Sequence, residues 1–426
     1  MIALLFIGLF ALLLVLRVPV AFAMLASVLV YLFVKGAPND LIVQRFVSGL
    51  ESFPLLAIPF FVLAGVVMTR SGIAQRIIGF ANSLVGNMRG GLAQVNVLNS
   101  VIMGGMSGSG TADAAIDSKV IVPEMVRKGY PKPFSAAITA TSGVMSALIP
   151  PSIVLILYGL QTGVSVGRLF IAGLLPALLI AAGLSVTVWI IARVKNYQPT
   201  SGWWSIREVW SQFRRAFWSL MMIVILFVGL RIGVFTPTEL GAVVAAYSLF
   251  LAMVLYRTVK VRDLAGILRE AVNLTAVIML ILGAATAFGY FVTVERLPQA
   301  FTTMITSITD NPVLLMLLIV LILLLMGTVM ESASLIIILA PLLAPFALQI
   351  GADPVHFGVL VVAALAVGGA TPPVGAVLFT VMTITHVKLG ELSKALVPFL
   401  VSVVISLVLI ALIPSISLFL PSVFFR

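Results

Sequence analysis

The stretch "GGMSGSGTADAA" (residues 104–115) interrupts a chain that is otherwise strongly apolar. It is not a phosphate-binding loop, because such a loop carries a Lys immediately before its Ser or Thr. Nor is it a hydrolase nucleophile elbow, because Ser109 stands where G-x-S-x-G requires a second glycine after Ser107. A break rich in glycines and hydroxyls therefore needs an explanation from its surroundings.

The composition of the chain indicates a membrane protein. Of its 426 residues, 62% are hydrophobic and only 9% are charged, and the mean hydropathy is +1.24. Soluble domains carry about 25% charged residues, so this chain has too little polar surface to face water. Apolar runs of about 20 residues, the length of a transmembrane helix, recur at, for example, 169–192, 217–234 and 273–292. Because the short alternating strands of a membrane barrel are absent, we expect an all-α, multi-pass protein of the bacterial inner membrane.

The charge of the chain fits the same class. The formal net charge is +11, from 25 basic and 14 acidic residues. Cytoplasmic loops of membrane proteins are enriched in Lys and Arg, so we expect the lipid bilayer as partner and no nucleic acid. The chain has no cysteine, which excludes disulfides and thiolate metal sites. Arg17 follows the first apolar run, which we interpret as an uncleaved helix with its N-terminus outside and Arg17 inside.

The sequence repeats itself at an offset of 222 residues. At this offset the opening stretch falls on "GTVMESASL" (residues 327–335). We therefore divide the chain into two homologous halves, 1–200 and 217–426, joined by a polar linker at 196–217. Six positions coincide without a gap: Gly105 with Gly327, Pro123 with Pro345, Gly129 with Gly351, Pro150 with Pro372, Pro151 with Pro373, and Pro176 with Pro398.

The flanking charges indicate that the two halves have opposite orientations in the membrane. Segment 92–126 is flanked by Arg89 and by the basic residues 127, 128 and 132. Its counterpart, segment 312–350, is flanked by Asp310 and Asp353. Positive charge favours the cytoplasm, so both ends of the first segment are expected inside and both ends of the second outside. Each segment is then a re-entrant hairpin, and the halves are inverted repeats, as in many secondary transporters.

The remaining segments are assigned around the hairpins. Residues 40–52 and 260–271 are expected as amphipathic helices along the membrane surface, and the linker, with its Trp and Arg residues, as a cytoplasmic interfacial helix. The first half contains scaffold helices in 1–70, a broken helix at 134–160 and a helix at 168–192. The second contains scaffold helices in 217–292, a broken helix at 355–384 and a C-terminal helix at 391–420.

The hairpin tip has the chemistry of a hard-cation site. Gly108 and Gly110 break the helix, which frees backbone groups that must be paired inside a bilayer. Ser107, Ser109 and Thr111 add hydroxyl oxygens. Carbonyl and hydroxyl oxygens without thiolate or imidazole suit a cation such as sodium. The helix that begins near Thr111 also directs its positive end at the tip, which favours an anionic substrate group.

The Pro-Pro pairs are expected to form the opposite wall of each site. Pro150 and Pro151 lack N–H groups and exclude normal pairing one turn earlier, which leaves the carbonyls of Ser146 and Ala147 to a cation. In the second half Thr371 supplies a hydroxyl. Each feature alone has a simpler interpretation: a proline kink, close helix packing, or ordinary helix capping at Thr111 and Ser332. Their occurrence in both halves at one spacing favours two related sites.

Several ionisable residues lie at membrane depth. Asp113, Asp117, Glu124 and Glu331 are rare intramembrane acids, for which a functional role is the first hypothesis. Asp113 can also be a first-turn acid, and Asp117 can pair with Lys119. The two histidines, 356 and 386, are expected near helix ends at the membrane interface.

These motifs resemble a known family. "GGMSGSGTADAA", "PEMVRKGYPKPFSAAITA", "PPS", "GTVMESAS" and "ATPPVG" are similar to the large, DctM-like membrane subunit of tripartite ATP-independent periplasmic (TRAP) transporters, over essentially the full chain. The resemblance implies an elevator-type, sodium-coupled importer of an organic acid such as sialic acid or a C4-dicarboxylate. It also implies a separate small four-helix membrane subunit (Q type) and a soluble periplasmic binding protein.

The resemblance also implies site residues. No organic cofactor and no enzymatic activity are expected, and sodium is the only metal. The first sodium site falls on Ser107, Ser109, Ser146, Ile149 and Pro151. The second, from the resemblance and the offset together, falls on Glu331, Ser332, Gly368, Thr371 and Pro373. The substrate-cavity candidates are Gly108, Gly110, Thr111, Asp113 and Ser334.

Three other functions remain open at this point. A stand-alone sodium–carboxylate symporter of related architecture needs no binding protein. A non-transporting subunit of an energy-coupling complex has no need of paired broken hairpins. A membrane enzyme requires a base or metal near the glycines, and the sequence offers neither.

Overall fold

The computed structural model describes residues 2–16, 18–36, 38, 40–51, 53–197, 205–232 and 235–425. Throughout this part of the chain every regular element is a helix, and no strand occurs. Within the described residues, six helices are long and apolar enough to cross a bilayer, or seven if the pair 54–70 and 73–85, bent by 71°, counts as one span. The expected all-α membrane fold is thus confirmed. Arg17, Trp203 and Trp204 lie outside the described residues.

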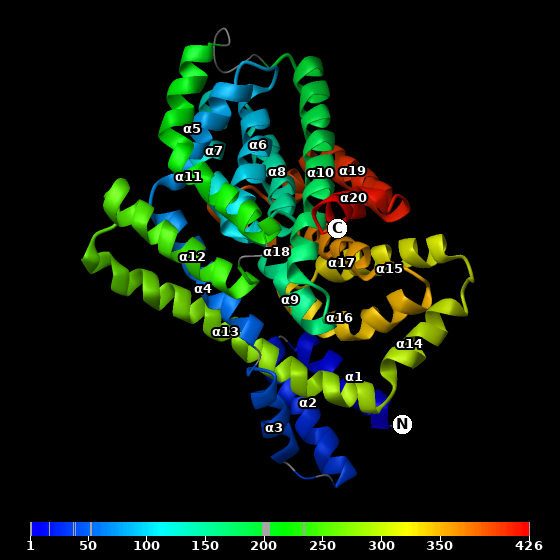
Figure 1. The fold of residues 1–426 in the computed structure, drawn as a ribbon. Coiled ribbons are helices and arrows are strands. Elements are labelled where there is room, and N and C mark those ends of the chain that lie inside the picture. Colours follow the sequence, from blue (N-terminus) through cyan, green and yellow to red (C-terminus); the bar gives the residue numbers. More distant parts are fainter. Residues whose placement is uncertain are drawn as a thin grey trace.

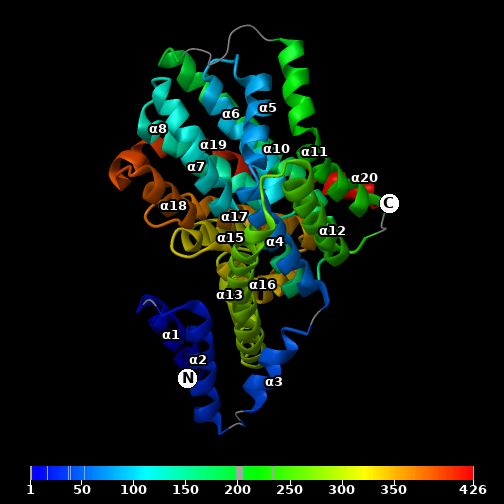
Figure 2. The same ribbon diagram turned by 90° about the vertical axis from the view of Figure 1, so that its left-hand side faces the viewer.

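The first half begins with three helices at one end of the molecule, and its hairpin follows at the other end (Figures 1 and 2). Its elements are α1 (Ile2–Val15), α2 (Val20–Lys35), α3 (Asp40–Ser48), the short 3-10 turn η1 (Phe53–Leu56), α4 (Ala57–Arg70), α5 (Ile73–Val85), the hairpin α6 (Gly91–Ser107) and α7 (Gly110–Arg127), α8 (Lys132–Ser142), the 3-10 turn η2 (Gly143–Ala147), α9 (Ile153–Thr162) and α10 (Val166–Val194).

The second half follows the same plan. Its elements are α11 (Ile206–Ile232), α12 (Pro237–Phe250) with a π-helical turn η3 (Leu251–Leu255), α13 (Val261–Val294), α14 (Leu297–Thr306), the hairpin α15 (Pro312–Gly327) and α16 (Ser332–Gln349), α17 (Pro354–Gly369), α18 (Ala376–Thr385), α19 (Leu389–Leu412) and α20 (Ser415–Phe424).

Local sequence signals start several of these helices. α12 begins at a capping box formed by Thr236 and Glu239, with Pro237 as its first residue. α17 begins at Asp353, whose side chain accepts from the amides of Val355 at 2.8 Å and His356 at 3.1 Å. Asp353, whose charge indicates the orientation of the second half, is therefore also a helix cap.

The two halves contact each other reciprocally. α7 of the first half packs against α18 of the second, and α16 of the second packs against α9 of the first. α7 and α16 start 222 residues apart and have the same length, so these two contacts are equivalents in the repeat. The contacts among the scaffold helices are also reciprocal: α4 of the first half packs against α12 of the second, and α13 of the second packs against α2 of the first. The inverted repeat is therefore built into the packing of the molecule.

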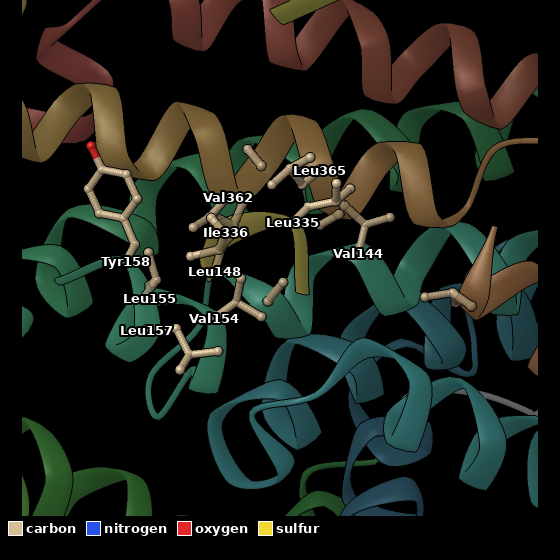
Figure 3. Packing of buried hydrophobic residues seen from close by; sticks show 14 of the residues in the cluster. Val144, Leu148, Val154, Leu155, Leu157, Tyr158, Leu335, Ile336, Val362 and Leu365 are labelled. Carbon is tan, nitrogen blue, oxygen red and sulfur yellow. The ribbon is translucent and has the colours of Figure 1, made fainter. Parts of the chain in front are cut away.

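The hairpins approach the centre from different sides, with α6 and α7 in the upper part of Figure 1 and α15 and α16 at the right. Apolar side chains fill the region where the halves meet (Figure 3). They include Val144, Leu148, Val154, Leu155 and Tyr158 of the first half, and Leu335, Ile336, Val362 and Leu365 of the second, all buried.

Two expected elements differ from the structure. The amphipathic helix at 260–271 is not separate, because it is the first part of the continuous 34-residue α13. In the first half Pro54 separates α3 from α4, whereas 261–294 contains no proline to end the helix. The C-terminal helix expected at 391–420 is also wrong as one element. It ends at Leu412, and α20 starts after Pro414 and packs against α10.

The linker region is helical where it is described. α11 starts at Ile206, and Trp210 and Trp218 on it are 60% and 45% exposed. An interfacial position for this segment remains a prediction.

Candidate functional site

The tip of the first hairpin is a tight glycine turn. α6 ends at Ser107, and Gly108 adopts a left-handed conformation with φ of 61° while its amide donates to the Gly104 carbonyl at 3.2 Å. A Cβ on Gly108 would lie 2.1 Å from the Pro151 carbonyl oxygen. Only glycine fits this position, because it must combine a positive φ with close backbone approach. The hairpin tip is thus packed directly on the Pro-Pro break.

The same junction is present in both halves. The Ile153 amide donates to the carbonyl of Gly108 at 3.4 Å, and the Gly375 amide donates to the carbonyl of Thr328 at 2.7 Å. Ile153 and Gly375 are 222 residues apart. In each half, therefore, a backbone amide that follows the Pro-Pro pair is satisfied by the tip of its own hairpin. The Pro150–Pro151 and Pro372–Pro373 peptide bonds are both cis.

Both tips open onto one cavity of about 460 Å³. This volume is in the range of small-molecule sites, about 300–1,000 Å³. Its walls come from residues 107–112 and 331–334 of the hairpin tips, from the broken segments of both halves, and from the scaffold helices α4 and α13. The cavity lies at the interface of the two repeats, where sites of inverted-repeat transporters are formed.

The polar lining of this cavity consists mainly of hydroxyls. Glu270 and Glu331 are the two acidic residues that line it, and no Lys, Arg or His is among its described lining residues. Hydroxyls come from Thr69, Ser107, Ser109, Thr111, Ser332, Ser334 and Thr380.

Two helices begin at the cavity. Ser109 is the N-cap of α7, and its hydroxyl accepts from the Ala112 amide at 3.4 Å and lies 3.0 Å from the Thr111 hydroxyl. Glu331 is the N-cap of α16 and makes no side-chain cap bond. Ser109 and Glu331 are 222 residues apart. The positive ends of two helices therefore meet at one cavity, which favours an anion, while the oxygens around them favour a cation.

The structure brings most of the expected site residues to this cavity. Ser107, Gly108, Ser109, Gly110, Thr111, Glu331, Ser332 and Ser334 all line it. The remaining members of the two expected sodium sites, namely Ser146, Ile149, Pro151, Gly368, Thr371 and Pro373, are not among the lining residues. They belong to the Pro-Pro segments on which the hairpins pack.

Three details correct the expected roles of the Pro-Pro segments and their neighbours. Asp113 does not line the cavity, because its side chain is fully buried and accepts from the Ser146 hydroxyl at 2.9 Å. The carbonyl of Ala147 is not unpaired, because the Ser152 hydroxyl donates to it at 2.6 Å, although the oxygen can still accept from a second partner. The Thr371 hydroxyl likewise donates to the Val367 carbonyl at 2.7 Å, although its oxygen can still accept. Local hydrogen bonds thus satisfy groups that the broken backbone frees.

The acidic residues also have different surroundings from those expected. Asp117 makes no ion pair with Lys119, because Asp117 is buried and Lys119 is exposed. Glu124 instead pairs with Arg127. His356 is buried in the first turn of α17 and His386 is the C-cap of α18, so both lie near helix ends as expected, and an interfacial position stays a prediction.

Sequence reasoning missed the scaffold side of the site. Thr69 of α4 and Glu270 of α13 line the cavity, and Arg70 forms an ion pair with Glu270. Sequence reasoning also missed Asn96 and Asn99 of the hairpin helix α6, which are fully buried and bond to Thr139 and Asp117. A search for uncharged polar residues within apolar segments would have found these two, whereas pairing between α4 and α13 depends on helices about 200 residues apart.

Comparison with known proteins decides the family. A profile described as "Tripartite ATP-independent periplasmic transporter, DctM component" matches residues 7–416. The chain is 39% identical to the C4-dicarboxylate TRAP transporter large permease protein DctM of Pseudomonas aeruginosa, over 92% of each chain. The chain belongs to the DctM family.

The names of other family members give different substrates. The sialic acid TRAP transporter large permease protein SiaM of Vibrio cholerae is 39% identical over 95% of each chain. The 2,3-diketo-L-gulonate TRAP transporter large permease protein YiaN of Escherichia coli is 36% identical over 88% of each chain. The protein is therefore a TRAP transporter large permease of the bacterial inner membrane, like the named relatives.

A solved structure shares the fold. The YdaH transporter of Alcanivorax borkumensis, described as having an unusual topology, superposes with a TM-score of 0.57 over 90% of this chain and 88% of that chain. The sequence identity is 15%, so this likeness concerns the fold alone.

Proposed function

We propose that this permease imports an organic acid, of the sialic acid or C4-dicarboxylate type, together with sodium ions. The observation that carries the proposal is the lining of the central cavity, which combines two helix N-termini and many hydroxyls with two acidic side chains and no basic one. A carboxylate substrate would meet favourable helix ends there. It would also meet the carboxylate of Glu331, which a sodium ion held beside the tip would offset, whereas the carboxylate of Glu270 is paired with Arg70.

The two sodium ions would lie between each hairpin tip and its Pro-Pro segment. Hydroxyl oxygens of Ser107 and Ser109, with backbone oxygens near Ser146 and Pro151, would hold the first. In the second half, Glu331, Ser332 and Thr371 would contribute to the equivalent site. Oxygen donors of this kind match sodium, which is a hard cation.

Transport would occur by an elevator motion. The hairpins and broken helices carry the binding groups and would move as one body against a scaffold that includes α4 and α13. That division is supported by the cavity walls, which come from the hairpins on one side and from α4 and α13 on the other. A small four-helix subunit would bind the scaffold, and a periplasmic binding protein would deliver the acid.

Uptake into proteoliposomes containing the chain and its small subunit tests this proposal. With binding protein and labelled acid outside, uptake is expected to rise steeply with external sodium, with more than one ion per substrate. A cross-link between α6 and α4, which pack together, should abolish uptake and leave the complex intact.

The controls separate the alternatives. Equal uptake with potassium or a proton gradient alone would overturn sodium coupling. Full uptake without binding protein would indicate a stand-alone symporter, and normal uptake by the cross-linked protein would overturn the moving-body mechanism.

A further inference from the structure

Two acidic side chains of α7, Asp113 and Asp117, lie inside the protein with no cation beside them. They are four residues apart, so they share one face of the helix, and neither has exposed surface. Neither takes part in the ion pairs formed among the described residues. Burial of two like charges is strongly unfavourable, because each loses its hydration and no opposite charge compensates it.

A directed chain of hydrogen bonds connects α8 to α6 beside these acids. Thr139 Oγ1 donates to the Ser135 carbonyl at 3.0 Å and accepts from Asn96 Nδ2 at 2.7 Å. Asn96 Oδ1 in turn accepts from Ser142 Oγ at 2.7 Å. Because the hydrogen of Ser142 is used in that bond, the 3.0 Å contact between Ser100 Oγ and Ser142 Oγ requires the hydrogen of Ser100.

Ser100 links this chain to the acid pair. Its hydroxyl oxygen also lies 3.4 Å from Asp117 Oδ2, but a hydroxyl has one hydrogen, and that of Ser100 points to Ser142. Asp117 Oδ2 therefore faces an oxygen that has no hydrogen to donate. The other carboxyl oxygen, Oδ1, accepts from Asn99 Nδ2 at 2.7 Å.

Two further oxygens at this place have no donor. Asn99 Oδ1 and Asp113 Oδ1 are buried and have no hydrogen-bond partner within the described part of the chain. Asn99 is uncharged, fully buried and directed at the acid pair through its bond to Asp117. Buried polar groups are almost always paired, so a group of acceptors that lacks hydrogens points to a bound positive charge.

Among the described residues, no fixed cation faces Asp117 from the helices that pack against α7. α7 packs against α6, α8, η2 and α18, of which α6, η2 and α18 contain no ionisable side chain. The ionisable residue of α8 is Lys132, which is exposed, as is Lys119 of α7 itself. Further along α7, Glu124 and Arg127 pair with each other. The positive charge must therefore come from solution.

We propose that Asp117 binds a proton on Oδ2 and donates a hydrogen bond to Ser100 Oγ. Each group in the hydrogen-bond chain then accepts from the group before it and donates to the next. The chain runs from Asp117 through Ser100, Ser142, Asn96 and Thr139 to the Ser135 carbonyl. We favour a proton over a metal ion because Asp117 Oδ2 lies 3.4 Å from Ser100 Oγ, within reach of one hydrogen bond, and the bonds beyond Ser100 run in one direction to Ser135.

The bound proton leaves one negative charge, on Asp113. The Asp113 carboxylate accepts a hydrogen bond from the hydroxyl of Ser146, a residue of the expected first sodium site. The proton on Asp117 itself does not depend on sodium coupling, so the two proposals can fail separately.

Infrared spectroscopy of the purified full-length chain in lipid nanodiscs tests the proposal. A protonated carboxyl has a carbonyl stretching band that a carboxylate lacks, and the band shifts in heavy water. Wild-type protein at neutral pH is expected to show such a band, and Asp117→Asn should lose it. Asp310→Asn is the matched control, because Asp310 is exposed, and it should retain the band.

Thermal melting supplies a second readout. In Asp117→Asn the amide can donate to Ser100 and its oxygen can accept from Asn99, so the melting temperature should stay near the wild-type value. Asp117→Leu has a similar size but neither function, and should melt lower. If Asp117→Asn cannot be purified, Ser100→Ala should shift the band by removing its acceptor.

Two results would overturn the proposal. In one, the wild-type spectrum contains no band that is sensitive to Asp117→Asn or Ser100→Ala. In the other, the band is present in choline chloride and disappears in sodium chloride at the same pH, which would make the pair a metal site.

Discussion

The hairpin α6–α7 of the first half and the hairpin α15–α16 of the second break at equivalent residues, yet their interiors differ in polarity. Both second arms, Gly110–Arg127 and Ser332–Gln349, begin at the cavity 222 residues apart. The first hairpin buries a network of polar side chains, whereas α15 is apolar from Pro312 to Gly327. At the 222-residue offset, Asn96, Asn99, Ser100, Asp113 and Asp117 correspond to Leu318, Leu321, Ile322, Leu335 and Leu339.

This difference separates two properties of the hairpins. The broken backbone, with its glycine tip and Pro-Pro partner, is common to both halves and provides the paired helix ends at the cavity. The buried hydrogen-bond network is confined to one half, so the geometry of the tips does not require it. The three predictions below test how far the symmetry of the halves extends.

The largest contrast is expected in accessibility. Because the halves are inverted, Lys132→Cys should be shielded from an impermeant thiol reagent added outside, and Asp310→Cys should react fully. Both residues are exposed, and the chain has no native cysteine. Asp310 is preferable to Asp353, whose side chain caps α17. Labelling of intact cells measures the contrast, and equal reaction of both positions from outside would show that the halves are parallel.

The next effect concerns the tip glycine. Gly108→Ala should abolish transport or folding, because its Cβ would lie 2.1 Å from the Pro151 carbonyl oxygen. Gly163→Ala is the matched control, since Gly163 has a φ of +73° but no atom within 4 Å of its Cβ position. It should cost only the strain of a left-handed residue, roughly 1–2 kcal/mol. Uptake and thermal melting compare them, and similar losses in both would mean that the close approach is unimportant.

The smallest effect is expected at the two equivalent N-caps. Ser109→Ala removes a hydroxyl that caps α7, a loss of about 1 kcal/mol, and should raise the sodium concentration for half-maximal uptake several-fold. Glu331→Gln keeps the shape of its side chain and removes a charge, so it should also weaken sodium dependence. A sodium titration of uptake compares each variant with wild-type protein. A sodium response unchanged in one variant alone would show that the ion sites are not symmetric.

Much of the fold could be predicted from local chemistry. Apolar length identifies membrane helices, and the Gly and Pro positions at 108, 150–151 and 372–373 mark backbone breaks that persist in the structure. The cavity residues of both tips were predicted for the same reason, since a helix break can be recognised from residues close together in the sequence. Asp113 was misplaced because which face of α7 meets η2, where Ser146 lies, depends on packing, which the local pattern does not specify.

By itself, the sequence determined that this protein is an all-helical membrane protein with two related halves and a broken hairpin in each. These properties follow from hydropathy, from the conformational limits of glycine and proline, and from a repeat spacing that is visible along the chain. Only the tertiary structure decided which distant groups satisfy the freed backbone, as when the Gly108 carbonyl accepts from the Ile153 amide. It alone placed Asp117 beside Asn99 and paired Arg70 with Glu270. Such contacts join different helices, and their energy depends on burial and geometry that no single segment contains.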